Sequence, residues 1–173
     1  GKYNDIKVFS THPILNSRGM RIHGYKAIDH FSRRNIIDVW DFGWDDKLGT
    51  VPPWNVNKAI KDEGLAEKNI VWYLQPHGPW IGETKLTIPV EEMKSRDEPI
   101  EWIVLDKIKK GEFSVELLKK AYKDNLELVL KYAKKIIKKW DEGKIIITAD
   151  HGEMLGEYGI YFHPTVIKSP ELR

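Results

Sequence analysis

Three histidines stand just past segments whose composition predicts β-strands. The pairs are residues 6–11 with His12, residues 69–75 with His77, and residues 144–149 with His151. In an open parallel sheet the ligand crevice lies outside the carboxyl ends of the strands, so imidazoles from neighbouring strands converge there. Chance alone could place one or two of the six histidines at such positions. If the three strands are neighbours, we expect their histidines to share one site.

Asp150 and His151 indicate a metal site most clearly. An adjacent carboxylate and imidazole at a strand end, followed by Gly152 to free the turn, can both face one hard or borderline cation. The chain contains no cysteine, so any metal must bind to nitrogen and oxygen. The alternative is that Asp150 caps a helix and His151 bonds to a backbone carbonyl. Glu153 could accept a hydrogen bond from these imidazoles or simply lie in the first turn of a helix.

His77 stands between two prolines, in the run Gln75-Pro76-His77-Gly78-Pro79. Proline restricts the backbone on both sides, so the imidazole would be presented from a loop with little freedom to lose on binding. The pattern predicts a site loop. The alternative is an ordinary turn in which His77 stacks on Trp80.

Hydrophobic periodicity predicts the elements that would position these residues. Helices are predicted over residues 25–33, 54–66, 99–110 and 114–141, and strands over 6–11, 35–40, 69–75 and 144–149. Residues 81–97 show no sustained period and predict an irregular surface segment. The long amphipathic helix ends at Gly143 and leads into the strand over 144–149, which is half of a βαβ unit. We therefore predict an α/β domain with a mostly parallel sheet flanked by helices, and the strand before Asp150 at its centre.

Composition narrows the class of protein. The 173 residues suit a single domain spanning 1–173, and 28 basic against 26 acidic residues give no electrostatic case for a nucleic-acid partner. No apolar run reaches the roughly 20 residues of a membrane-spanning helix. We expect no nucleic-acid and no membrane partner, and a cytoplasmic chain. The bias towards Lys, Ile and Glu without Cys is typical of heat-adapted, thermostable proteins.

Residues 145–157, with Gly159 and His163-Pro164 downstream, resemble the C-terminal metal segment of the alkaline phosphatase and sulfatase superfamily. Residues 40–53, 73–79 and 121–127 resemble small sulfatase-like proteins of that superfamily. The resemblance implies a metal-dependent hydrolase or group transferase acting on phosphate or sulfate esters. It implies Asp150 and His151 as metal ligands, His163 as a ligand or ester-contacting group, and His77 as a catalytic residue facing the leaving oxyanion. The cofactor would be a divalent metal such as Zn, Mn, Ca or Mg.

The superfamily pattern starts with a strand that carries another metal-binding aspartate and the nucleophile, and no such segment precedes Tyr3. Ser10 or Thr11 beside His12 is a weak substitute, because that region resembles a later strand of the superfamily. Two explanations stay open. The chain is a fragment of a longer protein, which we favour, or it is a reduced relative that binds a metal or an anion without turnover. Open sheet edges would make association into a homo-oligomer a secondary expectation.

Overall fold

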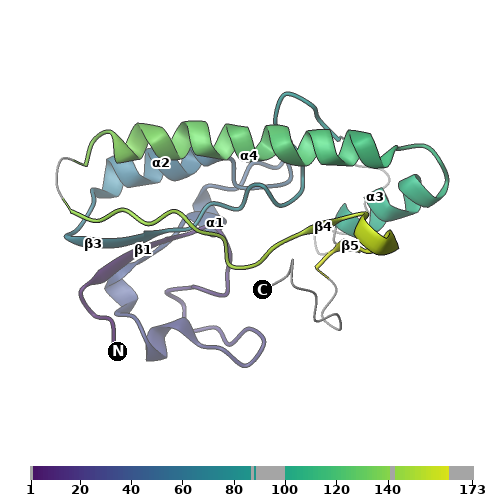
Figure 1. Cartoon of the computed structure of the whole chain (residues 1–173). Helices are drawn as coiled ribbons and strands as arrows, with labels where there is room; N and C mark the ends of the chain where they lie inside the picture. The colour runs from purple at the N-terminus through teal and green to yellow at the C-terminus, as the bar shows by residue number, and fades with distance from the viewer. Residues whose placement is uncertain (1, 87, 89–99, 141–142, 164–173) are drawn as a thin grey trace.

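A three-stranded parallel sheet organises the first part of the chain (Figure 1). The computed structural model describes residues 2–86, 88, 100–140 and 143–163. The strands are β1 (Ile6–Ser10), β2 (Ile36–Asp38) and β3 (Lys68–Val71), in the order β2-β1-β3. Val8 of β1 is in register with Ile36 on one side and with Ile70 on the other. β1 is therefore the central strand of this sheet.

Both faces of β1 are covered by apolar side chains. Successive residues of a strand point to opposite faces. Val8 packs with a cluster that includes Ala27 and Phe31, whereas Phe9 packs with a cluster that includes Val39 and Val51. Val8 and Phe9 are completely inaccessible to solvent. This double coverage fits a parallel strand with helices and loops on both sides.

Helices cover the sheet and extend beyond it. They are α1 (Val39–Phe42), α2 (Pro53–Glu63), α3 (Ile100–Lys109) and α4 (Val115–Ile137), with short 3-10 turns η1 (Ala27–Asp29), η2 (Arg33–Asn35) and η4 (Glu157–Gly159). α4 is the longest element and lies beside α2 (Figure 1). The side chain of Asn57 on α2 donates to the backbone oxygen of Tyr132 on α4 at 2.9 Å. No helix in the described ranges is long and apolar enough to cross a membrane.

The start of α4 follows from its sequence. The hydroxyl of Ser114 accepts a hydrogen bond from the backbone N–H of Leu117 at 3.0 Å, which satisfies one of the free donors at the helix end. The residues that α4 buries recur every three or four positions: Leu118, Ala121, Asn125 and Val129. This spacing puts them on one face of the helix.

A small antiparallel pair, β4 (Met154–Leu155) and β5 (Tyr161–Phe162), closes the described chain. Phe162 belongs to an apolar cluster with Trp80 and Leu118. Residues 143–153 run back below α4 towards β4 (Figure 1). The chain therefore brings residues 162 and 163 alongside the loop that follows β3.

The prediction of a buried central strand over residues 144–149 is wrong. This segment forms no strand, and Ile146 and Ile147 are 72% and 63% exposed. A strand needs a neighbour for its N–H and C=O groups, and within the described residues β1 pairs with β2 and β3 while 144–149 pairs with nothing. An apolar run predicts the preference for a strand but not the presence of its partner.

The other predicted elements differ mainly in length. The helix predicted over 25–33 is a single turn, η1, followed by η2, and the strand predicted over 35–40 shrinks to β2 because α1 begins at Val39. The strand predicted over 69–75 ends at Val71. The helices predicted over 54–66, 99–110 and 114–141 correspond to α2, α3 and α4. Most of the irregular segment predicted over 81–97 lies outside the described residues.

Candidate metal centre

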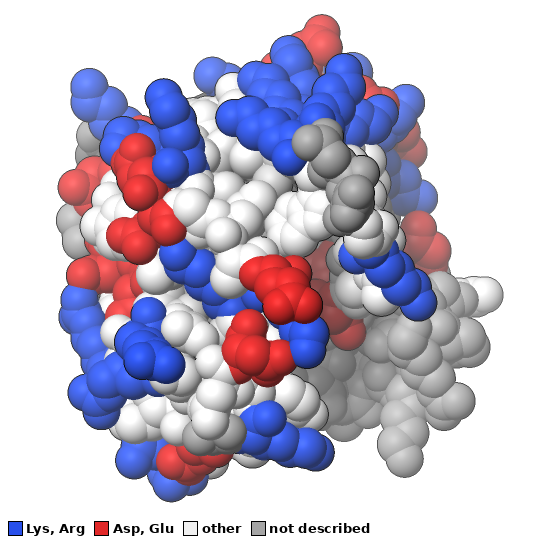
Figure 2. Space-filling view, turned by 90° about the vertical axis from the view of Figure 1, so that its left-hand side faces the viewer, with Lys and Arg blue, Asp and Glu red and all other residues white. Residues whose placement is uncertain are grey.

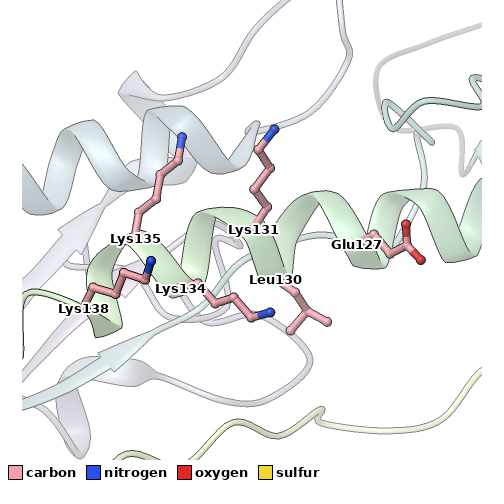
Figure 3. A pocket seen from close by; sticks show the side chains of 6 residues that line it. All are labelled: Glu127, Leu130, Lys131, Lys134, Lys135 and Lys138. Atoms are coloured by element: carbon pink, nitrogen blue, oxygen red, sulfur yellow. The ribbon is translucent and has the colours of Figure 1, made fainter.

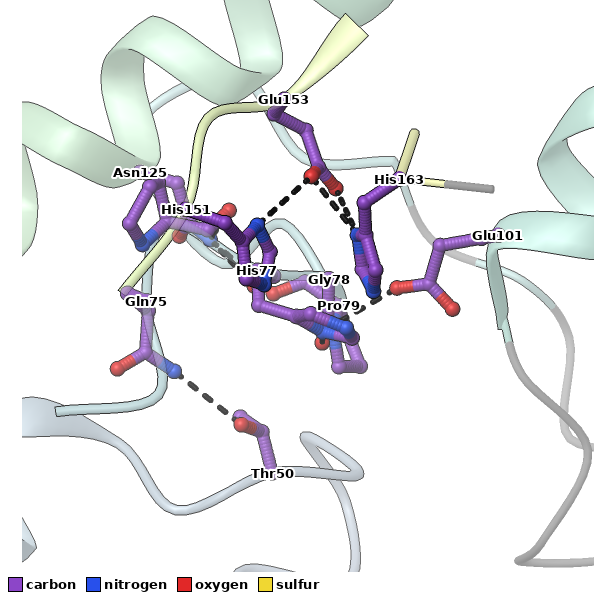
Figure 4. Close-up of polar contacts among 11 residues, drawn as sticks. Thr50, Gln75, His77, Gly78, Pro79, Glu101, Asn125, His151, Glu153 and His163 are labelled. Atoms are coloured by element: carbon purple, nitrogen blue, oxygen red, sulfur yellow. Dashed lines mark hydrogen bonds and ion pairs between the residues drawn. The ribbon is translucent and has the colours of Figure 1, made fainter. Parts of the chain in front are cut away.

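Four side chains that could bind a cation lie together below α4: His77, His151, Glu153 and His163 (Figure 4). His77 comes from the loop after β3, His151 and Glu153 precede β4, and His163 directly follows β5. The ring centres of His151 and His163 are 4.4 Å apart, and those of His77 and His163 are 5.9 Å apart. Segments from two distant parts of the chain therefore meet at this point.

Glu153 is the carboxylate of this cluster. Its side chain is only 10% exposed, and its oxygens lie 2.8 and 3.1 Å from Nδ1 of His163. Nδ1 of His151 is 3.8 Å from Oε2 of Glu153. Burying a carboxylate is costly unless a donor or cation compensates it. The two imidazoles and Glu153 thus form one interacting group.

Each of the three residues His151, Glu153 and His163 offers one ligand atom, and these atoms lie within 4.8 Å of one another. Two imidazole nitrogens and a carboxylate oxygen suit zinc and other borderline divalent cations.

The negative charges of Glu153 and Asp150 also affect a neighbouring side chain. Burial raises the pKa of the nearby Tyr122 phenol, and the charges of Glu153 and Asp150 raise this pKa further. The negative potential that Glu153 and Asp150 produce around the cluster therefore favours the binding of a cation.

The protonation of the imidazoles follows from their partners. Nδ1 of His77 lies 2.8 Å from the backbone oxygen of Gly78, and Nδ1 of His151 lies 2.8 Å from that of Gly152. A carbonyl oxygen only accepts, so both Nδ1 atoms must carry the proton. The same holds for His163, because Glu153 as a carboxylate only accepts. In the neutral ring each Nε2 is then the nitrogen with the free electron pair, which is the arrangement that prepares an imidazole for a metal.

His12 has the opposite arrangement. Its Nδ1 accepts a hydrogen bond from the N–H of Ile14 at 3.2 Å, so in the neutral ring Nε2 carries the proton. Burial lowers the pKa of His12, with the charge of His77 as a smaller cause. The ring stacks on Trp72 at 5.7 Å. His12 is therefore near the cluster but is not prepared as a ligand. The expected meeting of all three strand-end histidines holds for His77 and His151 only.

Asp150 lies at the exposed edge of the cluster. Its side chain is 60% exposed, and its Oδ1 accepts from the backbone N–H of His151 at 3.0 Å. The same oxygen is 3.7 Å from Nε2 of His151. Asp150 is not among the three residues whose ligand atoms lie within 4.8 Å of one another.

The loop that carries His77 is held by Asn125 of α4. The amide of this fully buried residue accepts from the N–H of Ile81 at 3.0 Å. Its Nδ2 lies within hydrogen-bonding distance of three backbone oxygens, those of Pro76 (3.2 Å), His77 (3.1 Å) and Pro79 (3.4 Å). Gly82 brings the loop against the helix, since a Cβ there would lie 2.6 Å from the carbonyl carbon of Asp124. This role was not predicted for Asn125.

The alternative for His77, stacking on Trp80, is not what the structure has. Among the described residues the ring contact of His77 is with His163, while Trp80 packs against Phe162 at 6.1 Å. Trp80 is only 2% exposed. It belongs to the apolar core beside the site.

A second feature lies far along α4 from this cluster. A depression of about 480 Å³ is lined by Glu127, Leu130, Lys131, Lys134, Lys135 and Lys138 (Figure 3). The lysine side chains point in different directions, and the Nζ of Lys135 lies over the ring of Tyr132 at 4.1 Å. Figure 2 shows the densest group of basic side chains at the top of one face, with basic, acidic and other residues mixed over the rest. These lysines form an exposed helix face.

The chain matches no model of a known protein family, no curated protein and no solved structure. The structure supports the α/β class with its parallel sheet and flanking helices. The superfamily resemblance stays a prediction from short motifs.

Proposed function

We propose that this chain binds a divalent cation through His151, Glu153 and His163 and takes part in hydrolysis or transfer of phosphate or sulfate esters. The observation that carries the proposal is the convergence of two imidazoles and one carboxylate within 4.8 Å. The resemblance of residues 145–157 to a superfamily of metal-dependent ester hydrolases gives the substrate class.

The donor set fits such a cation. A bound divalent cation would polarise the ester and stabilise the charge that develops on its oxygens. The chain supplies the rest: before binding, the carbonyl of Gly152 holds Nδ1 of His151 and Glu153 holds Nδ1 of His163. Glu153 would exchange its hydrogen bond to His163 for the cation, while His151, already fixed, would lose little freedom on binding.

His77 is positioned to act on the ester beside the cation. Its Nδ1–H is held by the Gly78 carbonyl, and its ring lies 5.9 Å from that of His163. Nε2 of His77 can therefore accept a proton and, once protonated, give it to a leaving oxygen or stabilise the charge of that oxygen. This is the role that the superfamily resemblance implies for His77.

A domain that binds the metal or an anion without turnover is the second candidate. In the described part of the chain, none of the hydrogen bonds and ion pairs of His77, His151, Glu153 and His163 involves a serine or threonine hydroxyl. A hydroxyl nucleophile would need a general base within reach.

Calorimetric titration with Zn²⁺ and Mn²⁺, followed by turnover of aryl phosphate and aryl sulfate esters, tests both candidates. We expect one cation per chain, and at least about tenfold weaker binding in His151→Ala and His163→Ala. His30→Ala is the matched control, because this ring stacks on Tyr25 outside the cluster. Metal binding with turnover supports the hydrolase, and metal binding without turnover supports the binding domain. Equal affinity in all variants would overturn the site.

A further inference from the structure

A buried carboxylate approaches His77 from α3. Glu101 lies in the first turn of this helix and is only 8% exposed. Its Oε1 is shielded from solvent, makes no hydrogen bond among the described residues, and lies 3.2 Å from Nδ1 of His77. In Figure 4 Glu101 reaches towards the imidazoles from the side opposite to α4. Glu101 falls within the helix predicted over residues 99–110, and no role beyond that was predicted for it.

The approach of α3 to the His77 loop depends on Gly78. A Cβ at this position would lie 3.2 Å from Oε1 of Glu101 and 2.9 Å from a methyl carbon of Ile100. Both contacts are tighter than side chains normally allow. Gly78 also provides the carbonyl that accepts from Nδ1 of His77. Its missing side chain therefore lets the carboxylate and the carbonyl face the same ring nitrogen.

A charge in the first helical turn needs no burial to be favourable. Glu116 holds the equivalent place in α4 and is exposed. Burying Glu101 is costly unless a donor or cation compensates its charge. Within the described residues, the ionisable group in ion-pair range of Glu101 is His77. The interaction with His77 thus accounts for the burial of Glu101 better than its position at the start of α3 does.

We propose that Glu101 is a positioning residue that acts through His77. Its negative charge, 3.2 Å from Nδ1 of His77, favours the form of the ring in which Nδ1 donates its proton to the Gly78 carbonyl and Nε2 is free. This inference rests on the proposed function for the use of Nε2 in ester chemistry. The Glu101–His77 interaction itself does not depend on it.

The interaction can be tested in the metal-free protein. We expect long-range ¹H–¹⁵N NMR to show the proton of His77 on Nδ1, with a low-field Nδ1–H signal. Glu101→Met keeps the volume and removes the carboxylate, so the signal should move upfield to the position set by the Gly78 carbonyl alone. Glu101→Gln removes only the charge, so the signal should also move upfield. Glu116→Gln is the control and should change nothing. A signal that is unchanged in Glu101→Gln, or a His77 protonated at Nε2, overturns the inference even if Glu101→Met fails to fold.

If the proposed turnover is found, steady-state kinetics distinguishes the positioning role of Glu101 from a purely structural one. We expect Glu101→Met to lower kcat for an aryl ester by about tenfold to a hundredfold with KM nearly unchanged. In a His77→Ala background the same substitution should cost no further activity, because groups that act as a unit are not additive. Equal losses in both backgrounds would refute action through His77. Absence of turnover would count against the proposed function and leave the NMR result to decide on Glu101.

Discussion

Replacing Asn125 with alanine should loosen the loop that carries His77 and destabilise the whole chain. The Asn125 amide has two protons to share among three backbone oxygens, and it accepts one further bond from Ile81. About three hydrogen bonds are therefore lost at a fully buried position. The net value is about 1 kcal/mol for each bond, with more where a buried group is left unsatisfied, so we expect a loss of about 2–4 kcal/mol.

Urea denaturation measures this loss. With a slope of about 2 kcal/mol per molar urea, the midpoint should fall by about 1–2 M at an unchanged slope. The matched control is Asn35→Ala, because the Asn35 amide makes one exposed hydrogen bond to the backbone oxygen of Asn4. The control should change the free energy of unfolding by no more than about 0.5 kcal/mol. If the two variants shift the midpoint equally, Asn125 does not hold the loop as we argue.

Three further predictions concern the framework around the site. Ser114→Ala removes the cap of α4 and should cost about 1 kcal/mol in thermal unfolding; an unchanged midpoint would contradict the capping role. Leu118→Ala empties a fully buried position and should cost about 2–5 kcal/mol in the same assay; a loss below about 1 kcal/mol would mean that the core collapses around it. Burial lowers the pKa of His12 below 6.5, so the folded state loses stability relative to the unfolded state as the pH falls below that value. His12→Phe keeps a ring against Trp72 and should flatten the stability profile between about pH 6.5 and 5, whereas a profile as steep as that of His30→Phe would show that another group titrates.

α2, α3 and α4 were predicted well because their signals are local. Apolar residues on one face and Ser114 at the start predict α4, and both signals lie within the segment itself. β4 and β5 have two residues each, too few for any periodic signal. The segment 144–149 failed for a different reason, since strand formation depends on a partner elsewhere in the chain.

The site was partly predictable from short motifs. The structure places His77, His151 and His163 close together, and these are three of the four side chains that the motifs singled out. Glu153 was expected only as a hydrogen-bond acceptor or as part of a helix turn, because the order of residues does not tell which way its side chain faces. The roles of Glu101 and Asn125 had no local signal, because each acts on a loop far away in the sequence.

The antiparallel pair of β4 and β5 is held by a ladder of only two residues on each side. His163 directly follows this pair, while His151 and Glu153 lead into it from an exposed, unpaired stretch. A ligand that bound only the folded arrangement would stabilise it in proportion to the logarithm of the ligand concentration. Chelating agents in a purification buffer would then lower the melting temperature of this part of the chain, and amide exchange near residues 151–163 would report the free concentration of the cation.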